Sequence, residues 1–275
     1  MASVDLPVRA RIEHRLDELV SENRFTIAVV FPTVGAVTLL ASAEGVAPEP
    51  LAFHPYLLLF GVVIMRLPLI AGVAPLVTRR VAAGIAVLVA YTYAIEFTGV
   101  LTGYPYGEFA YGIDLGPMVL SHVPAALPLF FLPLVMNAYL LCLLLLGGRA
   151  ARSHVRVPVT IAAVIGMDLV LDPAAVSLGF WFYHGGGAYY DVPWTNYAGW
   201  VVSATVAVTV LDYAFDRSGL LERVERCRFI LDDLISFVIL WGVVNAYFGN
   251  WIPAVLAVVY GVGLWRTDRF DLPRP

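Results

Sequence analysis

Long apolar runs alternate with short polar gaps along almost the whole chain. A membrane-spanning helix needs roughly 20 apolar residues, and the runs near that length cover residues 25–43, 55–75, 81–101, 120–146, 158–178, 197–215, 229–248 and 251–265. The fourth run carries three prolines near its start, so an irregular or kinked segment is expected there. The eighth run is short. The pattern predicts an all-α, polytopic integral membrane protein with about eight transmembrane helices.

The cationic residues predict the orientation of these helices. All 17 are arginine, and 16 of them fall into clusters within 9–24, 79–80, 149–156, 217–228 and 266–274. The gaps near residues 44–54, 102–117, 179–196 and 249–250 contain none. Because short cytoplasmic loops retain Lys and Arg, the alternation predicts that the N- and C-termini are both cytoplasmic.

Composition agrees with a single membrane domain. The chain is 60% hydrophobic and only 14% charged, which is too apolar for a soluble protein. We expect a cytoplasmic amphipathic leader over 1–24, one transmembrane domain over 25–265 and a cytoplasmic tail over 266–275, in a multi-pass protein of the cell membrane. The leader holds four arginines and no apolar core, so it is no signal peptide. It has apolar residues at helical spacing (Ile12, Leu16, Leu19 and Val20), which favours a helix on the inner leaflet.

Three carboxylic acids, Glu96, Asp168 and Asp172, lie well inside the predicted spans. Each costs several kcal/mol to insert into a bilayer and is therefore a functional candidate. Asp168 and Asp172 are four residues apart and share one helix face. Glu96 reaches a depth similar to that of Asp172, and Pro173 frees a carbonyl beside it. An apolar setting and mutual repulsion lead us to expect that at least one of the three is protonated.

Arg66 is the one cation expected at membrane depth, in the middle of the second span. A guanidinium stays charged there and needs a carboxylate partner. We expect Asp168 as that partner, because it is the deepest of the three acids, with Glu96 as the alternative. The role of Arg66 is left open between a structural ion pair and a contact with the substrate.

Two loops predicted on the outer side are rich in aromatic residues. Either they form an interfacial belt or they line a site, and the inner loops carry few such residues, which favours a site. The candidate binding residues in these loops are Tyr104, Tyr106, Trp181, Tyr183, His184, Tyr189, Tyr190, Asp191, Trp194, Asn196 and Trp200.

Two other classes of membrane protein fit poorly. Asp168 with Asp172, and Asp212 with Asp216, resemble carboxylate pairs that hold magnesium and diphosphate in prenyltransferases. The predicted topology places these pairs in opposite halves of the membrane, so they cannot share an ion. A retinal protein needs a lysine for its Schiff base, and the chain has none. No basic stripe for nucleic acid and no zinc-type Cys/His spacing is present.

Several motifs resemble those of the polytopic carotenoid hydratases. They comprise Glu96-Phe-Thr-Gly99 with Tyr104-Pro-Tyr-Gly107 and Phe109-Ala-Tyr111, then Asp168-x-x-x-Asp172-Pro173, then Gly179-x-Trp-x-Tyr183 and the run from Tyr189 to Trp200. The resemblance covers residues from about 55 to 265. It implies addition of water to the terminal double bonds of a long acyclic carotenoid, which gives tertiary alcohols. It also implies other carotenoid-pathway membrane enzymes as candidate partners. The lack of lysine and the net charge of −4 also suit a halophile.

The residues fit that chemistry without metal, nucleotide or redox cofactor. Hydration of a trisubstituted alkene needs a proton donor, stabilisation of a tertiary cation and a base for the attacking water. Glu96, Asp168 and Asp172 are the candidate catalytic acid and base, with His184 or Asp191 as alternative bases. Aromatic faces would stabilise the cation. A proton-coupled transporter or a carotenoid-binding structural protein is the rival class, although the two halves of the chain show no clear repeat.

Overall fold

The computed structural model describes residues 7–270, most of which are helical. In this range six helices are long and apolar enough to cross a membrane, and they cover Thr26–Ala43, Pro55–Leu76, Arg79–Thr102, Pro128–Ala151, Ser153–Ser177 and Trp194–Ala214. Their α-helical parts are α2 (Phe31–Ala43), α3 (Pro55–Val73), α4 (Arg79–Thr102), α5 (Pro128–Leu146), α6 (Ser153–Ser177) and α7 (Trp194–Ala214). A π-helical turn, Thr26–Val30, precedes α2, and 3₁₀ turns at Ala74–Leu76 and Gly147–Ala151 follow α3 and α5. The all-α class and the first six apolar segments are confirmed.

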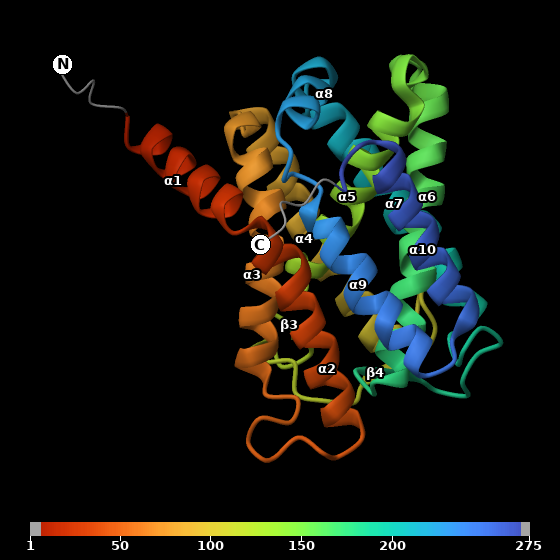
Figure 1. The fold of residues 1–275 in the computed structure, drawn as a ribbon. Coiled ribbons are helices and arrows are strands. Elements are labelled where there is room, and N and C mark those ends of the chain that lie inside the picture. Colours follow the sequence, from red (N-terminus) through yellow and green to blue (C-terminus); the bar gives the residue numbers. More distant parts are fainter. Residues whose placement is uncertain (1–6, 271–275) are drawn as a thin grey trace.

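The last two apolar segments form shorter helices, α9 (Asp232–Tyr247) and α10 (Trp251–Arg266), of 16 residues each. At 1.5 Å of rise per residue each is about 24 Å long, slightly less than the hydrocarbon thickness of a bilayer. They pack against each other, α9 also against α2 and α10 also against α6. Figure 1 shows both running along the bundle beside the longer helices.

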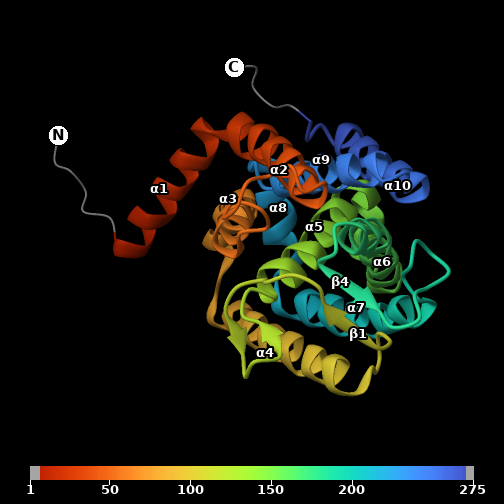
Figure 2. The same ribbon diagram turned by 90° about the horizontal axis from the view of Figure 1, so that it is seen from below.

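Helix α5 lies inside the bundle, and 12 of its residues are buried. It contacts α3, α4, α6 and α7, and Figure 2 shows it between these helices in the view along the bundle. The helix begins only at Pro128, because residues 118–124 form two short strands, β2 (Met118–Val119) and β3 (Val123–Pro124). The irregular start predicted from the prolines is confirmed.

The two aromatic loops meet at one end of the bundle. Strand β1 (Phe109–Tyr111) of the first loop pairs antiparallel with β4 (Trp181–Tyr183) of the second, with Tyr111 opposite Trp181. This end is the lower one in Figure 1, and Figure 2 shows the paired strands from outside. The pairing links α4 to α6 across the end of the bundle and carries loop side chains over its centre.

Two polar helices lie at the opposite end, α1 (Val8–Glu22) and α8 (Arg217–Arg226). Helix α1 extends away from the bundle (Figure 1). It is held by an ion pair between Asp17 and Arg223 at 2.8 Å and by a hydrogen bond from Arg9 to the carbonyl of Ala74 at 3.1 Å. Asp216 caps α8 by accepting from the amide of Gly219. The helix expected in the leader forms at Val8–Glu22, and its place on the inner leaflet stays a prediction.

Candidate active site

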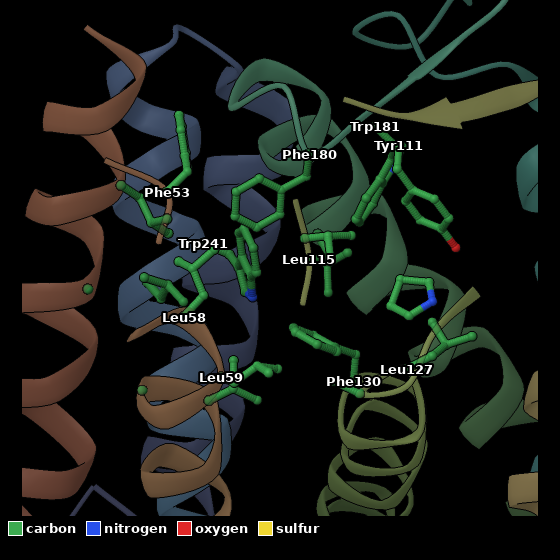
Figure 3. Close-up of a pocket in the computed structure, with 18 of the residues that line it drawn as sticks. Phe53, Leu58, Leu59, Tyr111, Leu115, Leu127, Phe130, Phe180, Trp181 and Trp241 are labelled. Atoms are coloured by element: carbon green, nitrogen blue, oxygen red, sulfur yellow. The ribbon is translucent and has the colours of Figure 1, made fainter. Parts of the chain in front are cut away.

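A cavity of about 410 Å³ lies in the half of the bundle that carries the paired strands. One wall consists of residues from α2, α3 and α9, and the facing wall comes from α4, α5, α6, α7 and the two aromatic loops. Figure 3 shows Phe53, Leu58 and Leu59 on one side, Trp181 and Tyr111 on the other, and Phe180 and Trp241 between them. Most lining residues are apolar, and the two carboxylic acids among them, Glu96 and Asp172, both come from the facing wall. A cavity of this size with few polar groups is typical of a small-molecule site.

Glu96 reaches the cavity from α4 and is hydrogen-bonded by Tyr111. The Tyr111 hydroxyl donates to Oε1 of Glu96, and both residues line the cavity. Burial, with the neighbouring carboxyl, raises the pKa of Tyr111 well above its usual range. The phenol therefore stays protonated and acts as a donor. The tyrosine comes from β1, so strand pairing with β4 fixes its position.

Asp172 reaches the cavity from α6 and is held by two donors. Its Oδ2 accepts from Nδ2 of Asn196 at 2.5 Å and from the hydroxyl of Tyr183 at 3.2 Å. The same amide nitrogen donates to Oδ2 of Asp168 at 3.2 Å. Asp168 is fully buried one turn away, does not line the cavity, and its Oδ1 has no hydrogen-bond partner. Asn196 therefore joins a carboxyl group that faces the cavity to one that lies behind it.

The local sequence positions this network. Pro173 cannot donate to the carbonyl of Leu169, and that carbonyl instead accepts from the hydroxyl of Tyr189 at 3.3 Å. The freed carbonyl expected from the sequence is thus present. Asn196 lies in the first turn of α7, three residues after the N-cap residue Pro193. The loop before α7 thereby places the side-chain amide of Asn196 beside α6.

Tyr106 forms a second polar contact at the cavity. Its hydroxyl and that of Tyr91 lie 2.7 and 3.1 Å from Oγ of Ser203. The Tyr106 ring packs directly over Gly199, where an added Cβ would come within 2.5 Å of Cδ1 of the ring. Residue 199 must therefore be glycine for Tyr106 to enter the cavity wall.

Aromatic rings cover much of the remaining wall. Trp200 stacks on Phe131 with ring centroids 5.6 Å apart, and Phe180 meets Trp241 edge to face at 6.4 Å. Together with Trp181, these rings line the cavity. Such faces can stabilise a cationic intermediate by about 0.5–2 kcal/mol each.

The structure divides the residues predicted from the sequence into two groups. Glu96, Asp172, Tyr106, Trp181, Tyr183, Asn196 and Trp200 line the cavity. Tyr189, Tyr190 and Trp194 instead pack on one another and on Tyr197. His184 and Asp191 are exposed in the loop, and Tyr104 is 69% exposed. Only part of the aromatic loop residues therefore surround the cavity.

Several residues that line the cavity were not predicted from the sequence. Tyr111 belongs to the motif that includes Glu96, and a hydroxyl so close in sequence to a buried acid was a usable signal. Phe131, Phe180 and Trp241 had no such signal, because apolar rings in apolar segments are common. The wall formed by α2 and α3 was missed for the same reason.

The expected ion pair between Arg66 and Asp168 is wrong. Arg66 forms its ion pair with Asp233 at the start of α9, and its Nε donates to the carbonyl of Leu129 at 3.1 Å. Asn137 donates to the other Asp233 oxygen at 2.6 Å. Arg66 is not among the residues that line the cavity. Asp168 lies on α6 beside Asn196, whereas α9 brings its own acid to α3, so the partner comes from a segment 167 residues away.

The second carboxylate pair lies far from this site. Asp212 accepts from Arg156 at 2.6 and 2.8 Å and from Tyr139 at 2.5 Å. It follows Asn196 on α7 by 16 residues, about 24 Å along the helix. The two pairs do not converge, as the sequence predicted. Within residues 7–270 no group of three or more His, Cys, Asp or Glu side chains is arranged to hold a metal ion.

A family model described as carotenoid biosynthesis protein matches residues 53–264. A protein of Haloarcula japonica, bisanhydrobacterioruberin hydratase, is 60% identical over 257 residues, which cover 94% of this chain and 87% of the relative. No solved structure matches. The matched range includes every residue that contributes a carboxyl group or a hydrogen-bond donor to the site.

Proposed function

The chain belongs to the family of carotenoid biosynthesis proteins, and from this premise we propose that it is a carotenoid hydratase acting at the cavity. The substrate is an acyclic carotenoid with terminal trisubstituted double bonds, of the kind named by the relative, bisanhydrobacterioruberin. Addition of water at both ends gives bacterioruberin. The observation that carries the proposal is a mainly apolar cavity with two carboxyl groups on one wall.

Glu96 serves as the proton donor. It accepts a hydrogen bond at Oε1 from Tyr111, while its surroundings are otherwise mainly apolar, with Ile95 and Phe109 among the neighbouring lining residues. The carboxyl proton moves to the less substituted alkene carbon, and the π electrons form the new C–H bond. A tertiary cation remains at the other carbon, and a carboxylate remains on Glu96.

The aromatic wall stabilises that cation, and Asp172 activates the water that captures it. Two donors to Oδ2 of Asp172 favour its carboxylate form. A water molecule between Asp172 and the cation gives its oxygen to carbon and one proton to Asp172. Exchange through water then moves a proton back to Glu96, so the net reaction adds one water and consumes no cofactor.

Asp168 acts as a positioning residue. It does not face the cavity, and it reaches Asp172 only through the shared donor Asn196. Two carboxyl groups this close avoid holding two charges. A neutral Asp168 leaves the charge on Asp172, where the attacking water needs a base.

The finer features of the membrane arrangement belong to the same proposal. Eight crossings, with α9 and α10 as the last two, place both termini and the arginine clusters in the cytoplasm. The cavity then lies in the outer half of the cell membrane, beneath the paired strands. Substrate dissolved in the lipid can approach it at that depth.

The test is conversion of an acyclic carotenoid by purified protein without added cofactor. Glu96→Gln and Asp172→Asn should each lower turnover by roughly 10²- to 10⁴-fold, the usual contribution of a positioned acid or base. Asp216→Asn is the matched control, because this acid caps α8 at the other end of the bundle; it should retain activity. Full activity in both cavity variants would rule out the assigned roles.

A further inference from the structure

The most exposed residues of the cavity lining lie on one side of it. Among its lining residues, those with exposed side chains are Val34, Thr38, Leu51, Leu57 and Phe60. All five come from α2, α3 or the segment between them. The lining residues of α4 to α7, α9 and the aromatic loops are buried or partly buried. The opening is therefore between α2 and α3, across the cavity from the wall that carries the acids.

The opening lies at membrane depth and is apolar. Phe60 is five residues into α3, about 7–8 Å below the start of the helix. Val34 and Phe60 are 57% and 58% exposed, as side chains that face lipid would be. Two glycines, Gly35 and Gly61, also line the cavity here, and an added Cβ at Gly61 would have no atom within 4 Å. The gap between the helices is thus unfilled at that position.

The cavity is too small for a whole long carotenoid. A volume of about 410 Å³ suits a ligand of drug size, which corresponds to the end group that reacts and little more. The rest of such a substrate is a long, apolar chain without hydrogen-bonding groups. It must leave the cavity through an apolar opening, and the structure offers one on the side away from the acids.

We propose that the gap between α2 and α3 is a binding subsite for the polyene chain of the substrate, which passes through it into the surrounding lipid. This inference rests on the proposed function. Val34, Gly35, Phe60 and Gly61 form the walls of the subsite, and the end group lies beyond them beside Glu96. The substrate enters and the product leaves sideways through the same opening.

The test uses a bulky residue at the opening and a matched control on the same helix. Val34 lines the cavity, whereas Val37 is equally lipid-exposed at 62% and does not line it. Val34→Trp should lower kcat/KM for a long acyclic carotenoid by at least about tenfold. Val37→Trp should stay within about twofold of the unmodified protein. If Val34→Trp does not fold, Gly61→Phe is a second way to block the gap. A Cβ at position 61 has no other atom within 4 Å, so this substitution causes no clash at its Cβ.

A short substrate separates obstruction from damage to the catalytic groups. A two-unit isoprenoid hydrocarbon with the same terminal double bond leaves no chain in the gap once it is bound, so Val34→Trp and Gly61→Phe should lower its rate of hydration clearly less than that of the long carotenoid. Equal effects of Val34→Trp and Val37→Trp on the long carotenoid would overturn the subsite, as would an equal loss with the short hydrocarbon.

Binding distinguishes failure of the subsite from failure of the proposed function. The shift of the polyene absorption band on binding is measured with the Glu96→Gln protein, which does not turn over. In the Glu96→Gln protein, Val34→Trp should weaken binding of the polyene by a factor similar to its loss of kcat/KM, whereas Val37→Trp should not weaken it. If the unmodified protein bound the polyene but never hydrated it, the proposed function would fail while this measurement still decided the subsite.

Discussion

Replacing the two members of the buried Arg66–Asp233 ion pair tests how the two halves of the bundle are joined. The side chains are 9% and 0% exposed, and they link α3 to α9. Loss of one member of a buried ion pair costs about 3–5 kcal/mol, because the other charge is left in an apolar setting. Arg66→Leu should lower the free energy of unfolding by about 3 kcal/mol, the lower end of this range. The remaining Asp233 can take up a proton, and it keeps its hydrogen bond from Asn137.

Asp233→Leu should lower the free energy of unfolding more, by about 5 kcal/mol, because the guanidinium of Arg66 stays charged. It would keep only the carbonyl of Leu129 as an acceptor among the contacts described. The double replacement Arg66→Leu with Asp233→Leu removes both charges and should recover several kcal/mol relative to Asp233→Leu. Simple addition of the two single losses would give about 8 kcal/mol.

The assay is reversible unfolding in mixed micelles, followed by circular dichroism as denaturing detergent is added. The double variant should lose clearly less free energy of unfolding than the sum of the single variants. Arg66→Leu combined with Asp168→Asn is the control, and these effects should add, because Asp168 contacts Asn196 instead. Additivity of the Arg66 and Asp233 replacements, with coupling between Arg66 and Asp168, would refute the pairing in the structure.

The remaining predictions concern the site and the topology. Tyr111→Phe keeps the ring and removes the donor to Glu96, so kcat should fall by roughly 10- to 100-fold with little change in KM; unchanged kcat would show that the hydrogen bond has no role in turnover. Ala188→Cys, in the exposed part of the second aromatic loop, should react with an impermeant thiol reagent in whole cells. Arg149→Cys should react only after lysis, and the opposite result would invert the topology. Exhaustive chelation should leave the activity unchanged, and restoration by magnesium after a loss would revive a metal-dependent reaction.

Much of the fold could be predicted because a bilayer imposes strong constraints on sequence. Hydropathy located the first six apolar helices, and Pro124, Pro128 and Pro133 indicated the irregular start of the fourth apolar segment, which contains α5. Glu96 and Asp172 were found because an acid in an apolar helix is costly and therefore rare. Their similar predicted depths agree with the cavity that both acids line, and their catalytic roles stay a proposal.

Contacts between distant segments could not be predicted in the same way. Asp168 was chosen for Arg66 by depth alone, but depth does not say which helices are neighbours in a bundle. Asp233 lies at the start of a span that was recognised, and its position next to another acid, Asp232, was an available signal. The cavity wall from α2 and α3 carries no charged residue, and its few polar side chains, such as Thr38 and Ser42, gave no signal that would distinguish it from lipid-facing surface.

The central claim is that the protein adds water across a carbon–carbon double bond. The most direct measurement is mass spectrometry of the product formed by purified protein from an acyclic carotenoid in ¹⁸O-labelled water under air. The account predicts that each new hydroxyl group carries oxygen from water, and that the reaction proceeds equally well without molecular oxygen. Unlabelled oxygen in the new hydroxyl groups, or a product without any new hydroxyl group, would contradict it.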